Sequence, residues 1–212
     1  MLKSFSNRPS PAIVFDFGGV LMDWNPHYLF DKLMNNDREA VDAFLERVSF
    51  RRWNEDFDLG KSFSEGTAEL IARFPEYTHL IRAYDTHYLD TVRGCHQSVV
   101  DILQELKHRE YPLFGLSNWS AEKFSLVRRK YPFFEYFEDI VLSGDVGLIK
   151  PAKEMYLLLL QRNSLSAQDC LFIDDYEPNV KTALDLGFQA VQFISAEQLR
   201  ADLAGRGILS PQ

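Results

Sequence analysis

Cysteine is scarce in this sequence, which contains Cys95 and Cys170 among its 212 residues. The two lie far apart and form no Cys-x-x-Cys motif, so the chain offers no cysteine pair of the kind that binds a metal or undergoes redox cycling. Cys170 lies in an apolar run and is expected to be a buried thiol. Because so little cysteine is typical of proteins from reducing compartments, we expect a cytoplasmic protein.

Long apolar runs and an excess of positive charge are also missing. The longest aliphatic run, Leu157 to Leu160, is far shorter than a membrane span, and residues 1–11 read as a polar leader without the apolar core of a signal peptide. The net charge is −8, which argues against non-specific binding of nucleic acid. We therefore expect neither a membrane nor a nucleic-acid partner. A phosphate site is still compatible with this charge, because such sites use local groups and backbone amides.

One stretch near the start organises the rest of the chain. The apolar run Ala12–Phe15 contains two β-branched residues and is followed by Asp16 and then by Gly18 and Gly19. This pattern predicts a buried strand that ends at a carboxylate. Ligands bind at the carboxyl ends of strands in open α/β sheets, and the two glycines allow the backbone to turn sharply and approach a ligand.

Three further polar motifs follow in order, each after its own strand-like run. They are Leu116-Ser117-Asn118, Lys150-Pro151 and Ile173-Asp174-Asp175. Between these motifs apolar residues recur at helical spacing, so that strands alternate with helices to the end of the chain. This alternation predicts an α/β fold, a doubly wound parallel sheet with right-handed crossovers.

Residues 24–93 interrupt the alternation and read as all-helical, with no strand. The expected elements are a helix after Asn25-Pro26, one after Asp37, one capped by Ser64, one around Leu80, and a polar loop over Arg51 to Lys61. An insertion directly after the first motif would lie over the ligand crevice. We therefore expect residues 24–93 to form a helical cap domain, and residues 1–23 and 94–212 to form the α/β core.

The four motifs, in this order, resemble those of the haloacid dehalogenase superfamily of aspartate-nucleophile hydrolases, from Ala12 to about Leu203. The resemblance implies a Rossmann-like core with a four-helix cap between the first and second motifs. Gly18 departs from the pattern, because phosphatases of this superfamily usually carry a second Asp there. The Asp16-x-Gly18 motif is similar to that of a subgroup of sugar-phosphate phosphatases resembling bacterial glucose-1-phosphatase.

The residue types and the resemblance together imply catalytic roles for Asp16 and Lys150. Asp16 would attack phosphorus and form an aspartyl-phosphate, while Lys150 offsets the charge of the phosphoryl group and orients Asp16. Attack on a phosphate dianion requires cations, and Mg²⁺ suits carboxylate and substrate oxygens. The expected metal ligands are Asp16, Asp174, Asp175 and the backbone carbonyl of Gly18. The expected substrate-binding groups are Gly19, Ser117, Asn118 and Lys150.

Gly18 leaves the proton transfers of such a reaction without an obvious side chain. The Asp usually found there protonates the leaving oxygen and then activates water, and loss of such a group costs about 10²–10⁴ in rate. Asp23, His27 and His87 are the replacements that the sequence offers. Asp23 also fits a hinge role, and the two histidines also fit polar helix faces.

Substrate choice is expected to come from the cap. Residues 51–56 offer amides, carboxylates, arginines and the Trp53 indole to a sugar, although a solvated loop fits them equally well. Trp24 and Trp119 are further candidates to face the crevice, or else they pack in the core. An aromatic cluster over residues 133–137 is expected to pack under the sheet. An exposed part of it could form a dimer contact, so both a monomer and a homodimer are compatible with the sequence.

The function favoured by these observations is magnesium-dependent hydrolysis of a phosphomonoester, with a small metabolite such as a sugar phosphate as substrate. Three alternatives stay open. A metal-independent 2-haloacid dehalogenase also uses an Asp nucleophile, but it leaves Asp174 and Asp175 unexplained. A non-catalytic phosphate-binding regulator would need no nucleophile, and a phosphomutase would need the acid or base that Gly18 does not provide.

Overall fold

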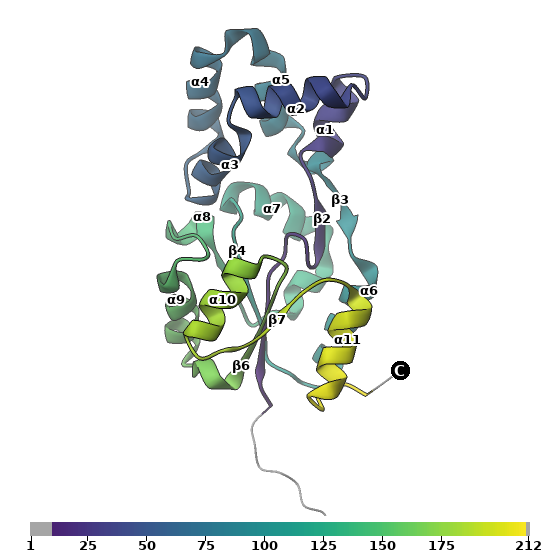
Figure 1. Ribbon diagram of the computed structural model, residues 1–212. Coiled ribbons are helices and arrows are strands. Elements are labelled where there is room, and N and C mark those ends of the chain that lie inside the picture. Colours follow the sequence, from purple (N-terminus) through teal and green to yellow (C-terminus); the bar gives the residue numbers. More distant parts are fainter. Residues whose placement is uncertain (1–9, 211–212) are drawn as a thin grey trace, which may run out of the picture.

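A five-stranded sheet forms the centre of the molecule (Figure 1). The computed structural model describes residues 10–210. The strands of the sheet are β1 (Ala12–Phe15), β4 (Leu113–Ser117), β5 (Asp139–Leu142), β6 (Cys170–Asp174) and β7 (Gln189–Gln192). All are parallel, in the order β5-β4-β1-β6-β7. The predicted parallel sheet is therefore confirmed, with β1 at its centre.

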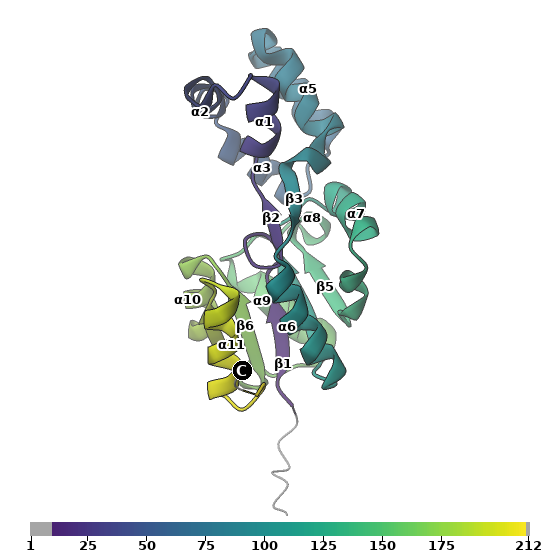
Figure 2. The same cartoon turned by 90° about the vertical axis from the view of Figure 1, so that its right-hand side faces the viewer.

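Helices cover both faces of this sheet (Figures 1 and 2). One face carries α6 (Gln97–His108), α7 (Ala121–Lys130) and α11 (Ala196–Gly205), and the other carries α9 (Lys153–Asn163) and α10 (Glu177–Asp185). Ile13 and Phe15 join the core on the first face, and Ala12 and Val14 join the core on the second. Because successive strand residues point to opposite faces, a strand covered on both sides is apolar throughout. This explains why β1 has no polar residue before Asp16.

Five helices, which we call the inserted helices, stand beyond the carboxyl ends of the strands (Figures 1 and 2). They are α1 (His27–Leu33), α2 (Arg38–Arg47), α3 (Phe50–Asp58), α4 (Phe63–Arg73) and α5 (Thr78–Thr86). They pack around a shared group of aromatic rings, to which Phe30, Phe50, Trp53, Phe57, Phe63 and Tyr84 contribute. A two-stranded antiparallel ribbon, β2 (Met22–Trp24) and β3 (Val92–Cys95), connects them to the sheet. A short helix, α8 (Ser143–Val146), follows β5.

The ends of the insertion differ from the sequence prediction. Strands β2 and β3 reach into residues 24–93, where we expected no strand. Strand β2 has three residues and β3 has four, and such short segments carry too little pattern to be recognised as strands. The expected polar leader lies outside the described residues except for Ser10 and Pro11.

The segment expected to be a polar loop over residues 51–61 is instead largely the helix α3. Arg51 and Arg52 are exposed, whereas Phe50, Trp53 and Phe57 are buried. Their spacing of three and four residues is that of one helix face. The next helix begins after Ser62 rather than at Ser64, because the Ser62 hydroxyl accepts a hydrogen bond from the Glu65 backbone N–H at 3.2 Å.

Gly115, in the middle of β4, shows how closely the sheet packs on the aromatic residues beside it. A Cβ at Gly115 would collide with the ring of Phe17, which is itself held by three further phenylalanine rings. We expect Gly115→Ala to lower the free energy of unfolding by about 1–3 kcal/mol, because overpacking forces neighbouring groups to move. Urea unfolding followed by circular dichroism measures this effect. Gly94→Ala is the matched control, since a Cβ there meets no atom within 4 Å, and equal stability of the two variants would contradict the prediction.

Candidate active site

Three polar side chains meet at one edge of the sheet. Asp16 follows β1, Ser117 ends β4 and Asp174 ends β6. Strands β4 and β6 pair with β1 on its two sides in parallel register, so their carboxyl ends lie together. The chain moves from β1 to β4 on one side and later to β6 on the other, and ligands bind at such a switch point. Motifs that are more than 50 residues apart in the sequence therefore converge on Asp16.

Asp16 lies at the centre of this cluster and is 8% exposed. Its Oδ1 accepts hydrogen bonds from the Ser117 hydroxyl at 2.8 Å and from the Phe17 backbone N–H at 2.7 Å. Within residues 10–210 no donor is bonded to Oδ2. Burial raises the pKa of Asp16 to about 7. The positive charge of Lys150 lowers this pKa, and the negative charge of Asp174 raises it further. The carboxylate is thus oriented through one oxygen and has the other free to react.

Lys150 joins Asp16 to Asp174. Its Nζ lies 3.0 Å from Asp16 Oδ1 and 2.6 Å from Asp174 Oδ2, and its side chain is 1% exposed. Burial alone would lower the pKa of this lysine, but the two carboxylates outweigh burial and raise it. Lys150 is therefore a fixed positive charge at the site.

Asn118, which we expected to bind substrate, uses its side chain on the backbone of Lys150. Its Nδ2 donates to the Lys150 carbonyl oxygen at 3.0 Å, and its Oδ1 accepts from the Lys150 N–H at 2.8 Å. These two bonds hold the Lys150 segment beside the end of β4. One N–H and the carbonyl oxygen of the Asn118 amide are thereby engaged within the protein.

A divalent metal ion fits beside Asp16. One carboxylate oxygen from each of Asp16, Asp174 and Asp175 lies within 4.8 Å of the other two, and hard oxygen donors suit Mg²⁺. Burial and the charge of Asp174 raise the pKa of Asp175, and a cation between the carboxylates would relieve this repulsion. Asp174 is held in place by Asn179 Nδ2 at 3.0 and 3.1 Å and by the Tyr176 backbone N–H at 2.9 Å. The structure thus brings together the three carboxylates expected to bind the ion.

The two glycines after Asp16 differ in what requires them. Gly19 has φ +77°, and a Cβ there would collide with the Asp175 carboxylate. Its backbone N–H donates to the Met22 carbonyl oxygen at 3.0 Å, so the amide that we expected to bind substrate is used inside the loop. A Cβ at Gly18, in contrast, would meet no atom within 4 Å.

A cavity of about 120 Å³ opens beside Gly18, between the core and the inserted helices. Its lining residues are Gly18, Trp24, Asn54, Asp58, Tyr88, Asn118 and Trp119. The indole N–H groups of Trp24 and Trp119 are buried and have no hydrogen-bond partner among residues 10–210. Both tryptophans thus border the crevice.

Sequence reasoning missed Tyr88 and Asp58 among the residues of this cavity, and Asp58 is the carboxylate of the two. It is the last residue of α3 and is partly buried. Burial raises the pKa of Asp58 to about 7, the Ser120 backbone N–H opposes the rise, and the charges of Glu55 and Asp16 add to it. Asp58 and Asn54 are four residues apart, so they lie on one face of a helix. The loop expected from the sequence over this segment does not group them.

The acid–base candidates proposed from the sequence lie elsewhere. Asp23 accepts a hydrogen bond from the Tyr28 hydroxyl at 2.7 Å. His27 lies 3.3 Å from Asp31 Oδ1, and the side chain of His87 is 61% exposed. None of the three candidates lines the cavity beside Gly18.

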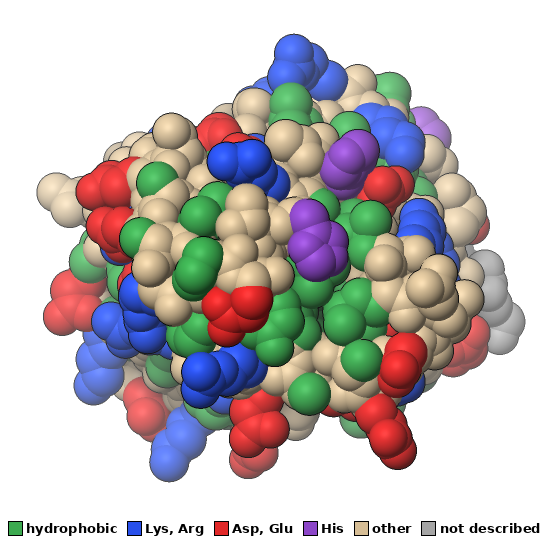
Figure 3. All heavy atoms as spheres, turned by 90° about the horizontal axis from the view of Figure 1, so that it is seen from above, with side chains coloured by type: hydrophobic (Ala, Val, Ile, Leu, Met, Phe, Trp, Pro, Cys, Tyr) green, Lys and Arg blue, Asp and Glu red, His purple; other side chains and the backbone are tan. Residues whose placement is uncertain are grey.

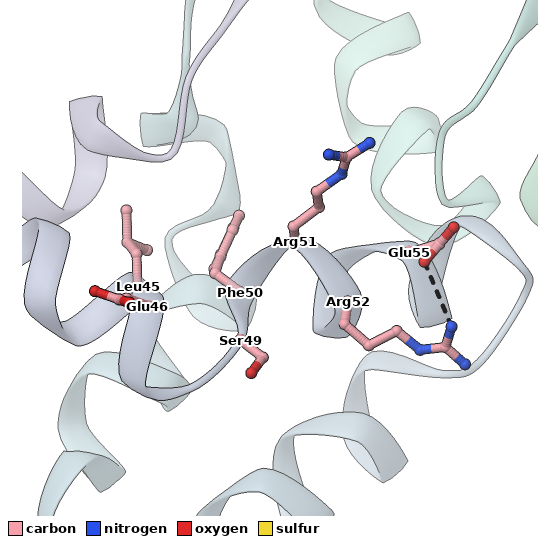
Figure 4. Close-up of a pocket in the computed structure, with 7 residues that line it drawn as sticks. All are labelled: Leu45, Glu46, Ser49, Phe50, Arg51, Arg52 and Glu55. Carbon is pink, nitrogen blue, oxygen red and sulfur yellow. Dashed lines mark ion pairs between the residues drawn. The ribbon is translucent and has the colours of Figure 1, made fainter.

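Most of residues 51–56 also point away from the site. Trp53 is buried, and its Nε1 donates to the Gly66 carbonyl oxygen at 3.1 Å, so it is not available to stack on a sugar. Arg51 and Arg52 border a separate cavity of about 490 Å³ between α2 and α3, where Arg52 pairs with Glu55 at 3.6 Å (Figure 4). The two cavities share no lining residue. Asn54 alone of residues 51–56 borders the cavity at Gly18.

The outer end of the molecule, formed by the inserted helices, carries mixed charge (Figure 3). Lysine and arginine side chains alternate there with aspartate and glutamate, and apolar side chains are scattered between them. None of the helices within residues 10–210 has both the length and the apolar character that crossing a bilayer demands.

Comparison with known proteins links these features to one family. A sequence model of the haloacid dehalogenase-like hydrolases matches residues 11–187. The sesquiterpene phosphatase astK of Aspergillus oryzae is 26% identical over 181 residues, which are 83% of this chain and 86% of that protein. The D-ribitol-5-phosphate phosphatase of Bacteroides thetaiotaomicron is 25% identical over 210 residues, which are 90% of this chain and 95% of that protein.

A solved structure has the same fold. It is a HAD family enzyme of Bacteroides thetaiotaomicron in complex with magnesium and inorganic phosphate, with a TM-score of 0.66 and 21% identity over 86% of this chain and 93% of that one. The family model covers all four motifs, and the fold brings these motifs together around Asp16. The chain therefore belongs to the haloacid dehalogenase-like hydrolases, and it is an enzyme.

Proposed function

We propose that this hydrolase is a magnesium-dependent phosphomonoesterase that acts on a small phosphorylated metabolite such as a sugar phosphate. One observation carries the proposal: three carboxylates that can hold a divalent cation meet the buried ammonium group of Lys150. A 2-haloacid dehalogenase uses an Asp nucleophile without metal-binding acids, so Asp174 and Asp175 favour the phosphatase. A phosphate-binding regulator would have no need of a reactive Asp16.

In the proposed reaction Asp16 attacks phosphorus, the bond to the leaving oxygen breaks, and an aspartyl-phosphate forms on Asp16. Water then attacks this phosphorus, which releases inorganic phosphate and restores the carboxylate. Ser117 and the Phe17 N–H orient the attacking group through Oδ1. Lys150 supplies positive charge next to the transferring group.

We propose that Asp16, Asp174, Asp175 and the carbonyl of Gly18 hold the magnesium ion. When bound, Mg²⁺ would neutralise charge where one anion attacks another. We assign Ser117 to orienting Asp16 and Asn118 to positioning Lys150, since their side chains make those contacts.

The cavity beside Gly18 supports a small polar leaving group. Its volume of about 120 Å³ lies below the roughly 300–1,000 Å³ of pockets that enclose drug-sized ligands. The polar groups of Asn54 and Asp58 in its lining suit hydroxyl groups of a sugar or sugar alcohol. The D-ribitol-5-phosphate phosphatase is a relative with such a substrate in its name.

We also propose that residues 24–93 act as a cap domain over a core of residues 1–23 and 94–212. The inserted helices contribute Asn54 and Asp58 to the wall of the cavity, while the core contributes Gly18 and Asn118. A site divided in this way would open and close with the motion of one part against the other. The free thiols of Cys95 and Cys170 support a reducing, cytoplasmic location.

The test is release of inorganic phosphate from a panel of sugar and sugar-alcohol phosphates and a phosphorylated sesquiterpene, with magnesium and after chelation by EDTA. We expect release in magnesium, fastest from a sugar or sugar-alcohol phosphate, and a loss of about 10²–10³-fold or more in EDTA, because a preorganised positive charge at the transition state is removed. Excess magnesium added after EDTA should restore the rate, which controls for damage by the chelator.

Two outcomes would overturn the proposal in different ways. Phosphate release that is unchanged by EDTA would remove magnesium from the mechanism. No phosphate release, combined with halide release from a 2-haloacid, would assign the chain to the dehalogenases.

A further inference from the structure

The proposed reaction needs an acid for the leaving oxygen and a base for water, and Gly18 offers neither. Nothing in the local backbone demands glycine at this position. Its φ is not among the positive values that Gly19 and four other glycines adopt, and a Cβ there would meet no atom within 4 Å. The missing side chain therefore leaves open space, and that space is part of the cavity between the core and the inserted helices.

We propose that Asp58, carried by the inserted helix α3, is the catalytic acid and base that takes the place of the side chain missing at Gly18. This assignment rests on the phosphatase function proposed above. It places the nucleophile on the core and the proton-transfer group on the insertion, so that the complete site exists only when the two parts are together.

The lining of the cavity narrows the choice to Asp58. Two of its residues are titratable, Asp58 and Tyr88. Burial raises the pKa of Tyr88 above its ordinary value, so this phenol stays protonated and cannot serve as a base near neutral pH. The indole N–H groups of Trp24 and Trp119 lie near the Tyr88 hydroxyl without completing a hydrogen bond. Of the groups that line the cavity, Asp58 is therefore the one that can both give and accept a proton near neutral pH.

A chain of hydrogen bonds orients the Asp58 carboxyl group. The Tyr84 hydroxyl donates to Asn54 Oδ1, and Asn54 Nδ2 donates to Asp58 Oδ2 at 2.9 Å. Tyr84 is fully buried, and burial raises its pKa well above the ordinary value, so it remains a donor. This fixes the direction of the Asn54 amide and occupies Asp58 Oδ2. No side-chain donor within residues 10–210 is bonded to Asp58 Oδ1, and the Ser120 backbone N–H is the further donor beside this carboxyl group. Because each carboxylate oxygen has two acceptor sites, Oδ1 retains one for substrate.

The surroundings of Asp58 also disfavour a permanent negative charge on its carboxyl group. It ends α3, where the helix dipole disfavours a negative charge. No lysine or arginine of the described chain forms an ion pair with it. Its pKa of about 7, caused first by burial, means that both protonation states are populated near neutral pH. Such a group matches the needs of general acid–base catalysis.

The proton that Asp58 donates in the first step of this reaction is replaced in the second step. As Asp16 attacks phosphorus, the bond to the leaving oxygen breaks, and that oxygen takes the proton of the Asp58 carboxylic acid. The Asp58 carboxylate then removes a proton from water while the water oxygen attacks the aspartyl-phosphate. The bond between Asp16 and phosphorus breaks, phosphate leaves, and Asp58 is again protonated.

The experiment compares Asp58→Asn with the wild type on two substrates, the best sugar phosphate of the panel and p-nitrophenyl phosphate. The alkyl leaving group needs a proton, whereas nitrophenolate leaves without one. We expect kcat/KM for the sugar phosphate to fall by about 10²–10⁴ and kcat/KM for p-nitrophenyl phosphate to fall less than about tenfold. We also expect a burst of nitrophenolate in the variant, because hydrolysis of the aspartyl-phosphate loses its base. Asp56→Asn, the same substitution on the same helix, should leave both activities unchanged.

The double variant Gly18→Asp/Asp58→Asn tests whether a carboxylate on the other side of the cavity can replace Asp58. A carboxylate at position 18 enters open space on the other wall of the same cavity, so we expect at least a tenfold recovery with the sugar phosphate.

Three results would overturn the assignment. Activity that is not recovered in the double variant would attribute the loss to a disturbed α3. Equal losses on the two substrates, or full activity of Asp58→Asn, would also contradict it. A wild type that releases no phosphate from either substrate would reject the phosphatase function, and the role of Asp58 with it. An active wild type with an unaffected Asp58→Asn variant would reject the role of Asp58 alone.

Discussion

Asp16→Asn is expected to lower kcat for phosphate release by about 10⁴–10⁶, the range seen when a nucleophile that works with its neighbours is removed. The amide of asparagine is not a nucleophile at phosphorus, so no covalent intermediate forms. Its Oδ1 can still accept the hydrogen bonds from Ser117 and from the Phe17 N–H. The fold and the rest of the cluster should therefore survive the substitution, and the loss should lie in the chemistry.

Rapid acid quench of the enzyme with ³²P-labelled substrate measures the intermediate directly. Wild-type protein should carry label that hydroxylamine removes, as expected for an acyl phosphate, and Asp16→Asn should carry none. Asp185→Asn, an exposed site at the end of α10, is the matched control and should label like the wild type. Labelling of the Asp16→Asn protein would move the nucleophile to another residue.

The parts of this fold that sequence reasoning predicted are those in which local pattern and tertiary role agree. Strand β1 is covered on both faces, so it is apolar throughout and stops at the residue that faces the ligand crevice. The same holds for β4 and β6, which end at Ser117 and Asp174. Since the strands are parallel neighbours, prediction of the strands was enough to predict that these side chains meet.

The inserted helix α3 was missed because its composition hides its periodicity. Six of its nine residues are charged or amide side chains, which favours a solvated loop when residues are counted rather than placed on a helix. The apolar stripe of Phe50, Trp53 and Phe57 packs α3 against the other inserted helices, on the rings of Phe63 and Tyr84. Missing this helix also hid Asp58, whose importance depends on a contact between two parts of the chain that are remote in sequence.

Gly19 and Asn118 show a second limit of prediction from sequence, which concerns the contacts that polar groups make. Their residue types suit a phosphate site, but the Gly19 N–H is bonded to Met22 and the Asn118 amide is bonded to Lys150. A motif predicts that polar groups are needed at a place. It does not predict which of them face the ligand and which hold the others in position, because that depends on distances across the folded site.

Lys150→Met is expected to weaken both the fold and the reaction. The ammonium group is buried between Asp16 and Asp174, and methionine fills similar space without charge. Removing one partner of a buried ion pair leaves uncompensated charge and costs about 3–5 kcal/mol. At about 2–4 °C per kcal/mol for a chain of this size, the midpoint of thermal unfolding in EDTA should fall by roughly 6–20 °C.

Magnesium should recover part of this stability, because a cation that binds the folded carboxylates and not the unfolded chain shifts the equilibrium toward the folded state. It should not recover activity, since the charge that Lys150 places beside the transferring group is still absent and kcat should stay about 10²–10³-fold below the wild type. Lys153→Met, at an exposed position at the start of α9, is the matched control for loss of one lysine. Thermal unfolding with and without magnesium separates the two effects. If Lys150→Met unfolded at the same temperature as Lys153→Met in EDTA, the buried carboxylates would not depend on Lys150 for their compensation.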